Sequence, residues 1–173
     1  MSGWSLKMWG SSNDRLCPGF RHPDEQYLHH HSCHRSAGPL VRVIVTGSRT
    51  WTNKATIWGA LWGALLVSGQ LTVVHGDCLD GADAIAKSWC DSYKEYGVIE
   101  EPHPANWDLY GKPAGFIRNR EMADLGADYC LAFIGPGPSK GTRHMVKKAT
   151  KAGIRVLTYD QLGNTESHGI DVL

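Results

Sequence analysis

The sequence lacks an excess of charge of either sign. Its 173 residues carry a formal net charge of +1, and the part from Val41 onward contains 14 lysines and arginines against 14 aspartates and glutamates. Non-specific binding to DNA or to an anionic membrane depends on a basic surface. The neutral charge therefore argues against DNA as a partner of this chain.

A long hydrophobic run is also missing. The longest apolar stretch, residues 55–67, includes two glycines and is too short to cross a bilayer, so we expect no membrane contact. We recognise no secretory signal segment, and the cysteines are odd in number and irregular in spacing. We therefore expect reduced thiols and a cytoplasmic location. The five cysteines are Cys17, Cys33, Cys78, Cys90 and Cys130.

Length and composition fit a single domain. A chain of 173 residues with 42% hydrophobic residues can fill one core but not two. Residues 1–40 show no sustained period, so we expect a poorly ordered N-terminal tail, then a domain at 41–160 and a C-terminal tail at 161–173. The cysteines and histidines of the N-terminal tail match no zinc-module spacing, so we expect no metal site.

From residue 41 the sequence alternates between strand and helix patterns. The β-branched run 41–46 ends at Gly47 and predicts a buried strand. Further strands are expected at 71–74, 98–99, 129–134 and 154–158, with helices between them. This alternation indicates an α/β fold with a five-stranded parallel sheet. The expected strand order is 3-2-1-4-5, with a switch point between the first and fourth strands.

The first expected helix carries an apolar stripe and two glycines. Thr52 or Asn53 can cap its start. Gly59 and Gly63 lie four residues apart and therefore share a face. We interpret this pair as allowing close packing on the sheet, in preference to a dimer contact.

Two glycine-rich loops are predicted to converge at the switch point, where open parallel sheets bind their ligands. Glycines let backbone N–H groups approach an anion, a helix N-terminus adds partial positive charge, and hydroxyls and an arginine can bind phosphate. Neither loop fits the GxxxxGK[ST] or GxGxxG motif. The candidate ligand-binding residues here are Gly47, Ser48, Arg49, Gly137, Ser139, Gly141 and Thr142.

The loop after the second strand, residues 75–83, holds three carboxylates within seven residues. We expect Asp77 or Asp80 to cap the next helix, and we expect another carboxylate to contact ribose, bind a metal or act as a base. Ribose contact or capping is favoured over metal binding. We interpret His75 as a strand-end residue with a satisfied hydrogen bond.

The helix expected after Pro113 contains a polar residue on its apolar stripe. Asn119 lies where an apolar side chain is expected, with Arg118 beside it and Glu121 three residues after Arg118. A polar group on a packed face needs a hydrogen-bond partner. That partner is either the adjacent loop or the ligand, and the sequence does not distinguish the two.

Four segments together resemble a known family. They are residues 42–49, 75–83, 118–123 and the pair Gly141-Thr142, and they are similar to the YspA-like branch of the SLOG superfamily. This superfamily joins the DNA-processing protein DprA with the Lonely Guy cytokinin-activating hydrolases. The resemblance covers about residues 41–160. It implies a Rossmann-like three-layer α/β/α sandwich that binds nucleotides or nucleotide-derived signals.

The resemblance leaves enzymatic activity open. Lonely Guy enzymes cleave the N-glycosidic bond of nucleoside monophosphates with an arginine and a glutamate. Arg118 matches the arginine, but the glutamate position is Met145, whose thioether cannot carry negative charge or exchange a proton. If the chain is a phosphoribohydrolase or N-glycosidase, Asp77 or Glu121 would replace the glutamate beside Arg118.

The favoured hypothesis is a protein that binds a nucleotide, an ADP-ribose-like molecule or a cyclic nucleotide signal. Other SLOG domains are sensors in bacterial and phage conflict, so a sensor or sequestering role is implied, in the host cytoplasm if a phage encodes the chain. No cofactor is expected, and relatives imply a homo-oligomer. DNA handling by analogy with DprA is least favoured, because the domain is neutral. Gly76, Asp77, Asp83, Arg118 and Asn119 complete the candidate ligand-binding set.

Overall fold

A computed structural model describes residues 40–168 of the chain. The strands are β1 (Val41–Gly47), β2 (Leu71–His75), β3 (Val98–Pro102), β4 (Tyr129–Phe133), β5 (Arg155–Tyr159) and β6 (Thr165–His168). The helices are α1 (Lys54–Ser68), α2 (Gly81–Tyr93), the 3₁₀ turn η1 (Lys94–Tyr96), α3 (Trp107–Tyr110), α4 (Ala114–Asp124) and α5 (Lys140–Lys151).

The strands form one sheet in the order β3-β2-β1-β4-β5-β6. The first five are parallel in the expected order, which confirms the α/β fold and the switch point between β1 and β4. The sheet has six strands instead of the expected five, since β6 pairs antiparallel with β5. A tight turn returns the chain to the sheet edge: the Asp160 carboxylate accepts hydrogen bonds of 2.9 Å from the backbone N–H groups of Leu162 and Asn164.

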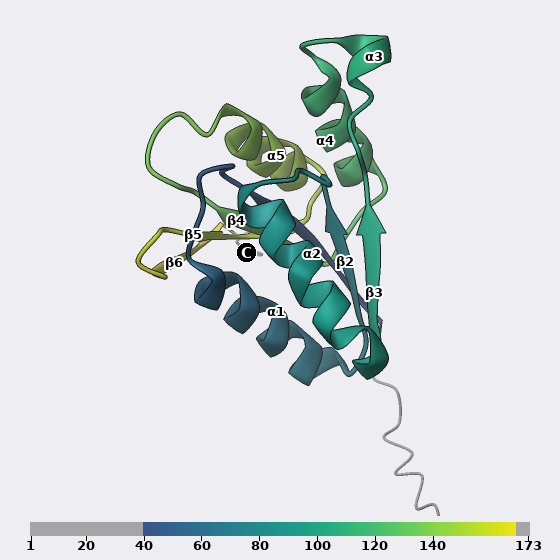
Figure 1. Cartoon of the computed structure of the whole chain (residues 1–173), viewed down its shortest axis with the longest axis vertical. Helices are drawn as coiled ribbons and strands as arrows, with labels where there is room; N and C mark the ends of the chain where they lie inside the picture. The colour runs from purple at the N-terminus through teal and green to yellow at the C-terminus, as the bar shows by residue number, and fades with distance from the viewer. Residues whose placement is uncertain (1–39, 169–173) are drawn as a thin grey trace, which may run out of the picture. The chain divides into compact units, whose positions relative to one another are not determined.

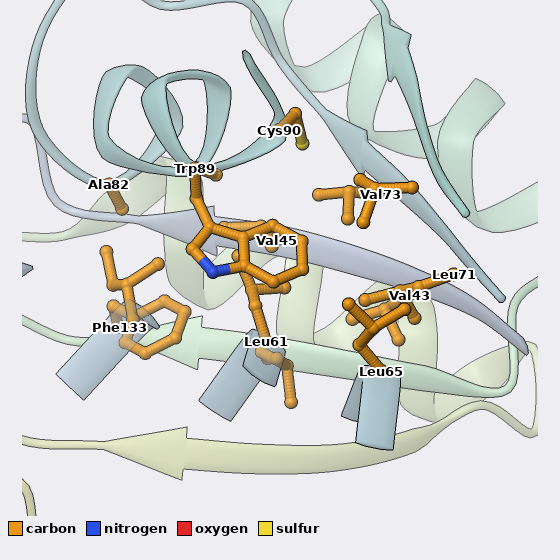
Figure 2. Packing of buried hydrophobic residues seen from close by; sticks show 14 of the residues in the cluster. Val43, Val45, Leu61, Leu65, Leu71, Val73, Ala82, Trp89, Cys90 and Phe133 are labelled. Atoms are coloured by element: carbon orange, nitrogen blue, oxygen red, sulfur yellow. The ribbon is translucent and has the colours of Figure 1, made fainter. Parts of the chain in front are cut away.

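Helices cover both faces of the sheet, which gives the expected three layers (Figure 1). α1 and α2 enclose one core cluster, and α4 and α5 enclose the other. β1 serves both clusters because side chains alternate along a strand: Val43 and Val45 face the first, and Ile44 faces the second. The fully buried Trp89 of α2 lies over β1 at the centre of the first cluster (Figure 2).

α1 begins as the sequence predicts, but its two glycines do not lie on the face that packs on the sheet. The Asn53 side chain caps the helix by accepting from the Thr56 N–H at 3.2 Å. Gly59 and Gly63 are exposed, and a Cβ added at either would meet nothing within 4 Å. The expectation that they pack on the sheet is therefore wrong. α1 is apolar on all sides, so the sequence pattern could not separate its inner face from its outer face.

The connection from β3 to β4 contains one helix more than expected. α4 follows Pro113, as predicted, and ends at Asp124, and the short α3 precedes it. In Figure 1, α3 and α4 stand beyond the carboxyl end of β3. No helix within residues 40–168 combines the length and the hydropathy needed to cross a membrane.

Candidate functional site

A cleft of about 660 Å³ opens at the carboxyl ends of β1 and β4. This is the position expected for a ligand site in an open parallel sheet, and the volume suits a small molecule. Residues from five segments line the cleft: Thr46, Gly47, Ser48, Arg49, Thr50, Cys78, Asp80, Asp83, Trp107, Lys112, Gly115, Phe116, Arg118, Asn119, Pro136, Pro138, Ser139, Lys140, Gly141 and Thr142.

The loop after β1 is held against its neighbours by backbone contacts. The Ser48 N–H donates to the Phe133 carbonyl of β4 at 2.9 Å, and the Ser48 carbonyl accepts from the Ala82 N–H at 3.3 Å. A Cβ at Gly81, where φ is +69°, would come within 2.2 Å of that same carbonyl oxygen. Gly81 therefore lets the start of α2 touch this loop. Arg49, the next residue of the loop, is exposed and lines the cleft.

The first turn of α5 forms another wall. Ser139 is the N-cap residue, yet its side chain makes no capping hydrogen bond. Its hydroxyl is buried and has no hydrogen-bond partner in the described part of the chain, with 7% of the residue exposed. Thr142 is buried beside it, and Gly141 and Lys140 are exposed. The N-terminus of α5, which carries a partial positive charge, therefore also holds the Ser139 hydroxyl, which has no hydrogen-bond partner.

Arg118 and Asn119 connect α4 to this turn. Arg118 Nε donates to Asn119 Oδ1 at 3.0 Å, and Asn119 Nδ2 donates to the Gly141 carbonyl at 3.0 Å. The partner of Asn119 is thus the neighbouring backbone, one of the two alternatives that the sequence left open. Arg118 Nη1 donates to the His103 carbonyl at 3.0 Å, and the guanidinium lies so close to Gly76 that a Cβ there would be 1.6 Å from Nη1.

Asp83 is the buried carboxylate of the cleft. It lies in the first turn of α2 with 8% of the residue exposed, and its Oδ2 accepts from the Cys78 N–H at 3.4 Å. Burial raises the pKa of Asp83 above its ordinary value, because a charged carboxylate is disfavoured away from water; the Arg118 charge opposes this effect. Perturbed carboxyl groups in clefts are candidates for functional sites.

The histidine that ends β2 is structural. His75 is fully buried, its Nδ1 accepts from the Asp77 N–H at 3.1 Å, and its Nε2 therefore donates to Glu100 Oε1 at 3.0 Å. This agrees with a strand-end histidine whose hydrogen bonds are satisfied. Asp77, at a φ of +50°, binds Lys87 Nζ at 3.0 Å. Asp80 occupies the N-cap of α2, but its side chain makes no capping bond.

Most predicted site residues meet in the cleft, and four do not. Gly76, Asp77, Gly137 and Glu121 are not among its lining residues. Gly76 instead makes room for Arg118, and Glu121 is exposed on α4. Met145 is fully buried in the core cluster under α4 and α5, so it packs in the hydrophobic interior.

The sequence interpretation missed one side of the cleft. Trp107 and Phe116 line it from α3 and α4, with Lys112 and Gly115 between them in the chain. The sequence offers one signal, a tryptophan in an irregular segment, but that segment has no period that would orient its side chains. Thr50, Cys78, Pro136 and Pro138 were missed as well.

Metal ligands do not gather in residues 40–168, where no three His, Cys, Asp or Glu side chains could hold one ion. The cysteines and histidines of the first 40 residues lie outside the described part of the chain, namely Cys17, His22, His29, His30, His31, Cys33 and His34.

Sequence comparisons identify a family and a relative of this chain. The model of the family described as "YspA, cpYpsA-related SLOG family" matches residues 41–110, which include the loops after β1 and β2. The "Gene 61 protein" of Mycobacterium phage D29 is 47% identical over 121 residues, which cover 68% of this chain and 95% of the phage protein. The similarity therefore extends over nearly the whole of a phage-encoded protein.

Proposed function

Because the chain belongs to the YspA, cpYpsA-related SLOG family, we propose that its cleft binds a nucleotide-derived small molecule through a phosphate group. Membership of this family points to a nucleotide-related ligand that the chain binds or processes. The observation that carries the proposal is Ser139: a buried hydroxyl without a partner costs about 1–3 kcal/mol, and a bound phosphate oxygen would satisfy it.

The surrounding groups suit the same ligand. Arg49 supplies a guanidinium that can bind phosphate through two hydrogen bonds, and the first turn of α5 supplies N–H groups and the Thr142 hydroxyl. Asp83 is placed to accept from a ribose hydroxyl. Arg118 is held by Asn119 and His103, so its charge stays fixed at the cleft before the ligand arrives.

The similarity to a phage protein supports a role in phage–host conflict, in which the chain senses or sequesters a nucleotide, ADP-ribose-like or cyclic nucleotide signal. Such a protein must bind its ligand without converting it. A location in the host cytoplasm remains part of this proposal.

One observation favours a second function, hydrolysis of the N-glycosidic bond. The raised pKa of Asp83 and its nearness to Arg118 would allow that carboxyl to exchange a proton. Asp77 and Glu121 lie outside the cleft lining and are poorly placed for this role. In this case AMP incubated with the protein releases adenine, and Asp83→Asn abolishes the release.

We further propose that two copies associate through the outer face of α1. Gly59, Trp62, Gly63, Leu66 and Val67 are exposed there at helical spacing, and no residue from 55 to 70 is charged. A contact related by two-fold symmetry brings identical faces together, so an uncharged face meets its copy without repulsion. The two glycines let the helix backbones approach closely.

The first experiment is native mass spectrometry of the chain purified from a bacterial host, followed by denaturation and identification of any released molecule. Calorimetric titration with AMP and ADP-ribose then compares the wild type with an Arg49→Ala, Thr142→Ala double variant. Lys147→Ala, at an exposed position on α5 outside the cleft, is the control.

We expect intact nucleotide binding that the double variant weakens at least ten-fold and the control leaves unchanged. Equal affinity in the double variant would place the ligand elsewhere. Absence of a co-purified nucleotide, together with no binding of either probe, overturns the proposed function.

A further inference from the structure

Two aromatic side chains form an apolar wall on the α3–α4 side of the cleft. Trp107 and Phe116 both line it, and they remain 49% and 42% exposed. The groups assigned above to phosphate come from other elements, the loop after β1 and the first turn of α5. The cleft therefore has a polar part with hydrogen-bond donors and a part formed by flat aromatic rings.

The position of Trp107 is defined by its neighbours. The Asn106 side chain caps α3 by accepting from the Leu109 N–H at 2.9 Å. At Gly115 of α4, a Cβ would lie 3.4 Å from Trp107 Cη2, so the edge of the indole rests against a backbone position that has no side chain. The ring is thus supported on one edge while half of the residue stays open to solvent.

Phe116 is fixed in a different way. Its ring makes an edge-on contact with the His144 ring, with centroids 4.7 Å apart. Among the described residues, Trp107 makes no such ring contact, although the other four tryptophans in this part of the chain do. The large exposed surface of Trp107 therefore has no role in the core.

We propose that Trp107 stacks on the base of the bound ligand, with Phe116 as a second apolar wall. This inference rests on the proposed function and deepens it. It selects a nucleotide with an intact aromatic base over a sugar phosphate or an inorganic phosphate. Every base offers a π face, so stacking provides affinity whatever hydrogen bonds the base edge makes.

The test compares AMP with ribose 5-phosphate, which retains the sugar and the phosphate but lacks the base. Calorimetric titration of both probes is carried out on the full-length wild type and on Trp107→Ala, Trp107→Phe and Leu109→Ala. Leu109 is the matched control, since it is an exposed hydrophobic residue of the same helix and is not among the lining residues. Thermal unfolding of each variant reports any structural effect.

Trp107→Ala is expected to weaken AMP binding roughly 5- to 100-fold, the range for loss of one base–aromatic stack. Ribose 5-phosphate should bind the wild type and Trp107→Ala equally. Trp107→Phe should restore most of the AMP affinity, and Leu109→Ala should change neither probe. A structural role for Trp107 would instead weaken both probes together.

The outcomes separate this inference from the proposed function. Unchanged AMP affinity in Trp107→Ala overturns the stacking inference. Phosphate binding would still be supported if the Arg49→Ala, Thr142→Ala double variant lost its binding of both AMP and ribose 5-phosphate. Failure of AMP to bind the wild type better than ribose 5-phosphate also overturns stacking. If the wild type binds neither AMP nor ribose 5-phosphate, the stacking inference is overturned, while a co-purified nucleotide or binding of ADP-ribose would still support the proposed function.

Discussion

Ser139 occupies the N-cap position of α5, yet its hydroxyl caps nothing. In most helices the N-cap side chain satisfies a backbone N–H, and its replacement by alanine costs about 1 kcal/mol. Here the hydroxyl is buried without a partner, so it destabilises the ligand-free protein. A residue that lowers stability and lines a cleft is typical of a site arranged for a ligand.

We predict that Ser139→Ala raises the free energy of unfolding of the ligand-free protein, by up to about 1 kcal/mol, because it removes an unsatisfied buried hydroxyl. The same variant should bind AMP more weakly. Urea unfolding and calorimetric titration measure the two effects. A loss of stability of about 1 kcal/mol in Ser139→Ala would instead identify the hydroxyl as an ordinary helix cap.

The buried carboxylate Asp83 gives a pH-dependent prediction. Its pKa is raised in the folded state, so its contribution to stability is fully present below the unfolded pKa and is lost as the pH rises through the folded pKa. Asp83→Asn should therefore be more stable than the wild type at pH 7. The difference should shrink as the pH falls below the unfolded pKa of about 3.9, because Asp83 then becomes protonated in both states.

Urea unfolding of both proteins from pH 3 to pH 8 measures this difference. Asp108→Asn on α3, an exposed aspartate outside the cleft lining, is the control and should follow the wild type throughout. If Asp83→Asn is less stable than the wild type at pH 7, the favourable interactions of the carboxylate outweigh its burial.

Among the secondary-structure elements, α1 stands out because its outer face is apolar and yet exposed. Its inner face packs on the sheet through Ile57, Leu61 and Leu65. Its outer face leaves Leu66 at 61% and Val67 at 88% exposed. A helix that is apolar all round is normally buried on every side. An interface between two copies of the chain would bury the outer face of α1.

We predict that the wild type is a dimer at tens of micromolar protein, measured by size-exclusion chromatography with light scattering. Leu66→Lys should be a monomer, because each copy would place an ammonium group in an apolar contact. Leu162→Lys is the control: Leu162 is 86% exposed in the turn before β6, so this variant should remain a dimer. A monomeric wild type, or a dimeric Leu66→Lys, contradicts the assignment.

At the scale of the whole molecule, the sequence predicts the parallel sheet well. Its hydrophobic strand segments, the glycines that follow them and the alternation of strand and helix patterns all indicate the same fold. The sequence does not predict β6, which follows a turn whose backbone N–H groups bond to the Asp160 carboxylate. Topology likewise predicts that the loops after β1 and β4 meet. It cannot decide which carboxylate faces the cleft, since Lys87 binds Asp77 while Asp83 is buried there.

The cleft exists only when the sheet is folded, so ligand binding should stabilise the whole domain. The lining residues come from segments that are as far apart in sequence as Thr46 and Thr142, so the unfolded chain offers no comparable site. A ligand that binds only the folded state stabilises it by about 2.7 kcal/mol when its free concentration is one hundred times its Kd. AMP at that concentration should therefore raise the free energy of unfolding by this amount.

Urea unfolding with and without AMP measures the effect, at a protein concentration held constant because association of copies also shifts apparent stability. The Arg49→Ala, Thr142→Ala double variant, with its affinity lowered at least ten-fold, should be stabilised by about 1.4 kcal/mol or less at the same AMP concentration. Arg49 is exposed but Thr142 is buried, so unfolding of the double variant without AMP gives its own reference stability, and only the increase caused by AMP is compared. Equal stabilisation of the wild type and the double variant would mean that AMP binds the folded chain outside the cleft.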